Sequence, residues 1–159
     1  MRFTLIKDLQ KERAMVMSIN ILLLFTLLYL VSDIVVKAEN FGITLSTLHT
    51  TLFGNTDEFI DPITRAAFLE HLHGEIFFMM MILLTLSAVF VRVSKKNSFS
   101  LWVVNLNLIS VLLSLIALAV GYFYLRSFLA MYLATFFSWH ILSFFMSLYA
   151  LWRLNAAKI

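Results

Sequence analysis

Four long apolar runs decide what this chain can fold into. They cover residues 14–36, 68–92, 99–122 and 128–151, and each supplies the roughly 20 residues that a helix needs to cross a bilayer core. Only 13% of the residues are charged and 62% are hydrophobic, whereas a soluble domain keeps about a quarter of its residues charged. The sequence therefore predicts an all-α integral membrane protein, a four-transmembrane-helix bundle forming one membrane domain over residues 1–159.

The placement of Lys and Arg predicts the orientation. Nine of the 12 basic residues fall in the N-terminal segment, the second loop and the C-terminal segment, and three fall on the opposite side. Because cytoplasmic segments carry an excess of Lys and Arg, we expect both termini in the cytoplasm, an N-in/C-in topology, with residues 1–13 as a basic topogenic tail. The expected location is a bacterial plasma (inner) membrane.

The first outer loop, residues 37–61, has structural signals of its own. Residues 43–53 place leucines on one side, which predicts a short interfacial helix that ends at Gly54. The dipeptide Asp61-Pro62 predicts the start of the next long helix, with Asp as the N-cap and Pro at the first position.

The third and fourth runs each carry a stripe of small or polar residues. Such stripes let membrane helices approach closely, and they are more often packing surfaces than chemical sites. The third run has Asn107, Ser110, Ser114, Ala117 and Gly121, and the fourth has His140, Ser143 and Ser147.

Ionisable residues gather where the second run begins, in the segment 70–75, which reads EHLHGE. Ionisable side chains inside a membrane are costly and usually functional. The height of each residue above the cytoplasmic side follows from counting about 1.5 Å per residue from the basic residues at that end of its helix. The heights are roughly 30 Å for Asp33, about 28 Å for His73, about 25 Å for Glu75 and about 20 Å for His140. We therefore expect three helices to bring these side chains to the outer part of the bundle.

One interpretation of these residues is a b-type haem held between facing helices. His140 and His73 (or His71) would bind the iron, and Arg65 and Arg126 would pair with the propionates. The architecture, four spans with histidines on the second and fourth, resembles that of small membrane b-type cytochromes. On this interpretation the expected function is redox chemistry or electron transfer with quinol. However, the two histidine levels differ by roughly 8–9 Å, more than one axial pair spans without tilt.

A second interpretation is a single divalent or iron-type metal ion. Glu70 and His73 lie one helical turn apart, and His71 and Glu75 form a second such pair. Nitrogen and oxygen donors of this kind suit zinc, iron or manganese. The full set of candidate ligands is His71, His73, Glu70, Glu75, His140, Asp33 and His49.

A third interpretation needs no cofactor. The chain would be a non-catalytic accessory subunit or a small proton-coupled transporter, with Asp33 and Glu75 as the proton-coupled groups. His140 would then hydrogen-bond Glu75 or a facing hydroxyl. The bilayer is the expected partner in every case, with a quinone and a second copy or a larger membrane complex as further candidates. Nucleic acid is not expected, because the basic residues lie at the ends of apolar runs.

Overall fold

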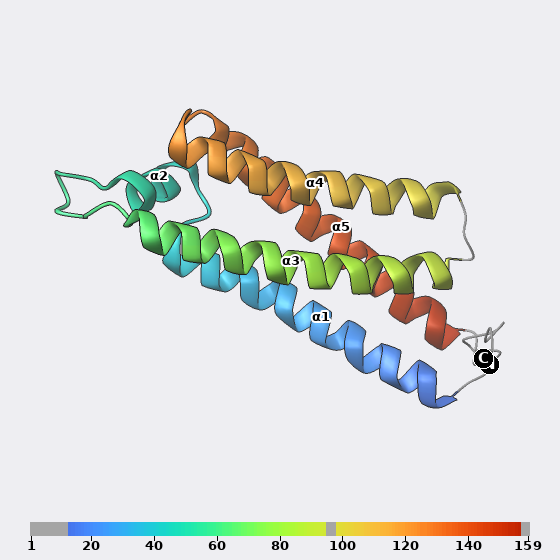
Figure 1. Cartoon of the computed structure of the whole chain (residues 1–159). Helices are drawn as coiled ribbons and strands as arrows, with labels where there is room; N and C mark the ends of the chain where they lie inside the picture. The colour runs from blue at the N-terminus through green and yellow to red at the C-terminus, as the bar shows by residue number, and fades with distance from the viewer. Residues whose placement is uncertain (1–12, 95–97, 157–159) are drawn as a thin grey trace.

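The chain is a bundle of long helices with one short helix at its end (Figure 1). A computed structural model describes residues 13–94 and 98–156; the predicted N-terminal tail and the turn residues Lys95 and Lys96 lie outside the described residues, apart from Arg13. The helices are α1 (Arg13–Asn40), α2 (Leu45–Phe53), α3 (Arg65–Val93), α4 (Ser98–Phe123) and α5 (Phe128–Ala156). The four long helices are apolar enough to cross a membrane, which confirms the predicted all-α membrane bundle.

The four long helices lie alongside one another, and α2 caps one end of the bundle (Figure 1). We call this the α2 end. The opposite end carries Arg13, the last turn of α3 and Ala156, and we call it the Arg13 end. Helix α5 contacts each of the other four helices and packs most extensively against α4. Any site in the interior is therefore bounded by α5.

Small and polar side chains form the seam between α4 and α5, as the sequence predicts. Its α4 side buries Asn107, Ser110, Ser114, Ala117 and Gly121, and its α5 side buries Ser143, Ser147 and Ala150. The Asn107 amide nitrogen donates a hydrogen bond to the Ser143 hydroxyl at 3.0 Å. Close packing and interhelical hydrogen bonds hold membrane helices together, because lipid is as apolar as the side chains themselves.

Helix α1 buries a single narrow stripe. Its members recur every three to seven residues: Val16, Leu23, Thr26, Leu30, Asp33 and Lys37. Residues at this spacing lie on one helix face, and that face packs against α3 and α5. Its last two members are charged, so α1 brings an acid and a base into the interior near the α2 end. Lys37 lies in α1, which continues to Asn40, and not in the predicted outer loop.

The connection between α1 and α3 is partly as predicted. Helix α2 forms where expected and ends at Gly54, whose φ of 78° lies in the left-handed region. The prediction that Asp61-Pro62 starts the next helix is wrong: α3 begins at Arg65, and its N-cap is Thr64, whose hydroxyl accepts from the Ala67 amide at 3.2 Å.

The backbone of residues 55–60 explains the later start of α3. Asn55 and Ile60 exchange two backbone hydrogen bonds of 2.9 Å, which closes a tight turn. The Ile63 amide then donates to the Thr51 carbonyl at 3.1 Å. These bonds tie the chain back to α2 and hold it in a non-helical path as far as Thr64.

Two glycines in long helices give a matched test of the α4–α5 packing. A Cβ at Gly121 would lie 2.6 Å from Leu129 Cδ2 and 3.2 Å from its Cγ, whereas a Cβ at Gly74 would meet no atom within 4 Å. We expect Gly121→Ala to lower the free energy of unfolding by about 1–3 kcal/mol through overpacking. Gly74→Ala should be neutral or raise it by up to about 1 kcal/mol through helix propensity. Unfolding by SDS titration in micelles measures both changes. A larger loss of stability for Gly74→Ala than for Gly121→Ala would contradict this packing.

Candidate functional site: a charge cluster beside the α1–α3 cleft

Four ionisable side chains are buried together where three helices meet. Helix α1 supplies Asp33 and Lys37, α3 supplies Glu75 and α5 supplies His140, and each is at most 9% exposed. We call these four residues the charge cluster. Asp33 and Lys37 are four residues apart, so they lie one above the other on the same face of α1. Burying charges is unfavourable unless each one has a partner, so the contacts of each member matter.

Lys37 joins α1 to α3. Its ammonium group donates a hydrogen bond to Glu75 Oε2 and lies 3.5 Å from the Tyr132 hydroxyl. The ammonium also lies 4.7 Å from the centre of the Phe136 ring, a distance typical of a cation–π interaction. A carboxylate, a hydroxyl and an aromatic face therefore surround the buried cation.

His140 joins α5 to α1. Its Nδ1 lies 2.9 Å from the Phe136 carbonyl oxygen, and because a carbonyl only accepts, Nδ1 carries the hydrogen. Its Nε2 lies 3.1 Å from Asp33 Oδ2, within ion-pair distance, although neither atom has a partner with hydrogen-bond geometry. Two bare acceptors at this distance would repel each other. Either member of the pair can carry a proton between them, His140 as an imidazolium or Asp33 as a carboxylic acid.

A cleft of about 420 Å³ between α1 and α3 opens beside the charge cluster. It is lined by Tyr29, Ser32, Asp33, Val36, Lys37, Asn40, Phe41, His71, Glu75 and Phe78. The His71 ring stacks on Phe41 with 3.9 Å between centroids. Its Nε2 is 4.0 Å from Glu75 Oε1, too far for a hydrogen bond, and this buried nitrogen has no hydrogen-bond partner. The α1–α3 cleft thus contains unused hydrogen-bonding capacity next to three members of the cluster.

The structure brings together only part of the predicted site. Asp33, Glu75 and His140 meet in the charge cluster, and His71 lines the adjacent cleft. Glu70 and His73 are exposed on α3. A helix that buries Glu75 turns Glu70 and His73 to other faces, because consecutive residues point about 100° apart.

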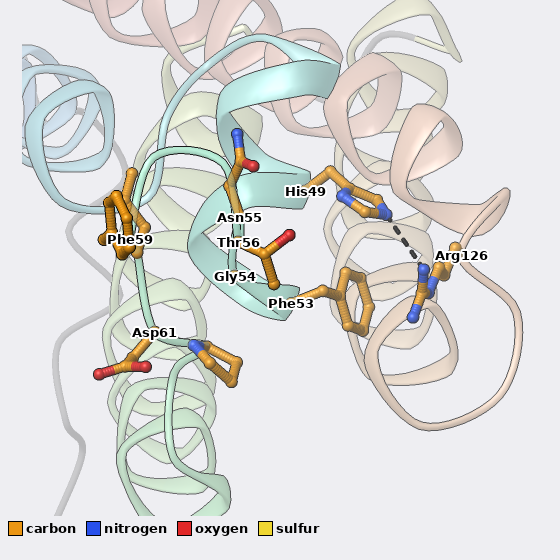
Figure 2. A pocket seen from close by; sticks show the side chains of 10 residues that line it. His49, Phe53, Gly54, Asn55, Thr56, Phe59, Asp61 and Arg126 are labelled. Carbon is orange, nitrogen blue, oxygen red and sulfur yellow. Dashed lines mark hydrogen bonds between the residues drawn. The ribbon is translucent and has the colours of Figure 1, made fainter.

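The remaining predicted residues lie at the α2 end. Arg65 is exposed, with its guanidinium 5.5 Å from the centre of the Phe123 ring. His49 and Arg126 both line a second pocket and contact each other, with 3.4 Å between His49 Nε2 and an Arg126 nitrogen (Figure 2). The Arg126 guanidinium also lies 4.4 Å from the centre of the Phe53 ring. Arg126, one of the two predicted haem-propionate partners, therefore contacts α2.

The geometry gives the haem and metal hypotheses no support, and both stay predictions. Both ring nitrogens of His140 face protein atoms, and His73 is exposed. Across residues 13–94 and 98–156, no three His, Asp or Glu side chains gather as a metal site requires. In the charge cluster, the Lys37 ammonium already occupies the place beside Glu75 that a cation would take.

Sequence reasoning missed Lys37 and Tyr132. The polar composition of residues 37–61 predicts a loop there, although the spacing of four between Asp33 and Lys37 places both on one helix face if the helix continues. The predicted heights also separated Asp33 from His140, which are in contact. Helix α5 runs obliquely to α4 (Figure 1), so residue counts along each helix do not give heights on one common axis.

Comparison with known proteins places the chain in a family. Residues 42–158, more than half of the chain, match the family model Aq_1264_TM, described as a transmembrane helical domain. The chain belongs to this family. Glu75 and His140 lie inside the range that matches the Aq_1264_TM model, whereas Asp33 and Lys37 on α1 precede it. No curated protein and no solved structure shows a significant match to the chain.

A double-mutant cycle tests the pairing of Lys37 with Glu75. Lys37→Met leaves a buried carboxylate without its partner, and we expect a loss of about 3–5 kcal/mol in the free energy of unfolding. Adding Glu75→Gln removes that stranded charge, so the double variant should be more stable than Lys37→Met alone. Unfolding in micelles at neutral pH measures all four proteins. Additive losses would show that the two side chains do not act as a pair.

Proposed function

We propose that the protein is a small proton-coupled membrane transporter whose charge cluster takes up and releases protons. The observation that carries this proposal is the burial of two acid–base pairs, Asp33 with His140 and Lys37 with Glu75, across three helices. Ionisable residues inside membrane bundles pair with one another and mark proton and substrate pathways. Hydroxyls and small residues hold α4 against α5, whereas these two ionisable pairs lie where α1, α3 and α5 meet.

The proton content of the cluster determines its charge. With Lys37 and His140 protonated and both carboxylates ionised, the positive and negative charges balance. Loss of one proton leaves a net negative charge in the interior, and an uncompensated buried charge is strongly unfavourable. The helices that hold the pairs must then move relative to one another, or a cation must enter the cluster. Proton binding is in this way linked to the arrangement of α1 relative to α3 and α5.

The α1–α3 cleft supports a route for these protons. Asp33, Lys37 and Glu75 line it, so three members of the cluster can exchange protons with whatever fills the cleft. His140 lies behind Asp33 and is only 1% exposed. In the proposed transporter, Asp33 therefore lies between the cleft and His140.

We also propose that the Arg13 end faces the cytoplasm of a bacterium and that the α2 end faces outward. Arg13, Arg92 and Arg153 lie at the Arg13 end, which fits the positive-inside rule. The seven carboxylates beyond residue 12 all lie between Asp33 and Glu75, toward the α2 end. Lys37, one of the basic residues toward the α2 end, is neutralised by Glu75.

Proton flux in liposomes tests the transporter. Vesicles that contain the protein and an internal pH-sensitive dye should acidify when a negative-inside potassium diffusion potential is imposed. Glu75→Gln should remove most of this flux, because glutamine cannot exchange a proton. Glu70→Gln is the matched control, since Glu70 is an exposed glutamate five residues earlier on the same helix. Flux equal to that of protein-free vesicles, or equal flux from Glu75→Gln and the unchanged protein, would contradict the proposal.

Cysteine labelling tests the orientation. The chain has no cysteine, so a single introduced thiol is the only one present. In intact bacterial cells, a membrane-impermeant maleimide should label Thr56→Cys in the α2-end loop and should not label Asn155→Cys at the end of α5. Labelling of Asn155→Cys alone would reverse the proposed topology.

A further inference from the structure

We propose that the α1–α3 cleft binds an uncharged, lipid-soluble ring with oxygen substituents, the chemical class of the membrane quinols. The inference deepens the proposed function and rests on it, because it names the class of molecule that binds in the cleft beside the charge cluster. The position, charge balance and hydrogen-bonding capacity of the cleft each point to this class.

The cleft is reached from the lipid side of the bundle. Val36 and Phe78 are about half exposed at its rim, and both belong to helices that are long and apolar enough to span the membrane. Its volume of about 420 Å³ falls within the range of small-molecule sites. A ligand with a hydrocarbon tail can therefore leave the tail among lipids and place its polar head against the cluster.

The charge balance of the cleft favours an uncharged head. Glu75 is paired with Lys37, and Asp33 faces His140, so both carboxylates already have a basic partner. A cationic ligand would meet the Lys37 ammonium, and an anionic ligand would meet two carboxylates. Either would add an uncompensated charge at low dielectric, which an uncharged ring avoids.

The unused polar atoms favour a hydroxyl-bearing ring. His71 Nε2 is buried without a hydrogen-bond partner, 4.0 Å from Glu75 Oε1. A ligand hydroxyl group beside this gap can donate a hydrogen bond to Glu75 Oε1. It can accept one from His71 Nε2 when that nitrogen carries the hydrogen. Binding needs only hydrogen bonds and packing, and no electron transfer.

Aromatic side chains on both helices complete the match to a flat ring. Phe41 stacks on His71 and lines the cleft, and Tyr29 and Phe78 stand together with 5.9 Å between ring centroids. Aromatic faces of this kind pack well against another ring. The polar edge of such a ligand would face Glu75 and His71, and its faces would contact these aromatic side chains.

Binding of decylubiquinol, kept reduced under nitrogen, tests the inference on the full chain in nanodiscs. Trp139 serves as the reporter after Trp102→Phe and Trp152→Phe remove the other two tryptophans. It is fully buried, and its ring centroid lies 3.9 Å from that of His140, so lipid-dissolved quinol does not reach it directly. We expect a saturable change in Trp139 emission.

Two histidine variants distinguish binding in the cleft from binding elsewhere on α3. His71→Phe keeps a ring to stack on Phe41 but loses the nitrogen, and the lost hydrogen bond should weaken binding about tenfold. His73→Phe is the matched control, because His73 is exposed on the same helix two residues away. Its affinity should equal that of the unchanged protein.

Three outcomes would overturn the inference: no saturable binding, equal effects of the two variants, or displacement of the quinol by decyltrimethylammonium at equal concentration. Glu75-dependent proton flux without quinol binding would overturn the ligand class alone. Quinol binding by a protein that shows no flux would instead overturn the proposed transporter.

Discussion

The contact between Lys37 and Glu75 is the interaction on which the position of α1 depends. In a bilayer, apolar side chains gain little by moving from lipid to a neighbouring helix, so polar contacts and close packing decide where a helix lies. Much of α1 presents large apolar residues to the lipid. Its polar contacts hold it at two levels: Asn20 with Asn155 of α5 at 3.1 Å near the Arg13 end, and the charge cluster near the α2 end.

Helices α4 and α5 are joined in a different way. Their seam is made of small side chains and the Asn107–Ser143 hydrogen bond, none of which carries a charge that depends on pH. Helix α5 belongs to both systems, because its small residues face α4 and its His140 faces Asp33. The bundle therefore combines a helix pair whose packing does not depend on protonation with a helix whose contacts do. The site lies where the two systems meet.

The sequence was sufficient for features that depend on composition and helical period. The membrane bundle and the small-residue seam follow from these signals. The same signals place Asp33, Glu75 and His140 in one part of the bundle, but they do not predict the contact between Asp33 and His140. Features that depend on where an element ends were harder to predict. Lys37 begins a polar stretch of sequence, which predicts a loop, yet its partner on another helix lets α1 continue through it. The N-cap is Thr64 and not Asp61, because backbone hydrogen bonds in the preceding turn keep the chain non-helical as far as Thr64. Residue type alone does not reveal these bonds.

The spacing of Asp33 and Lys37 has a consequence for biosynthesis. Helix α1 precedes α3 and α5 in the chain and enters the bilayer ahead of them, so its acid and base arrive without Glu75 and His140 beside them. An acid and a base four residues apart on one helix can pair with each other, which lowers the cost of inserting both. Assembly of the bundle then exchanges one intrahelical pair for two interhelical pairs. The same two residues that fix α1 in the mature protein thereby make its insertion as a single helix less unfavourable.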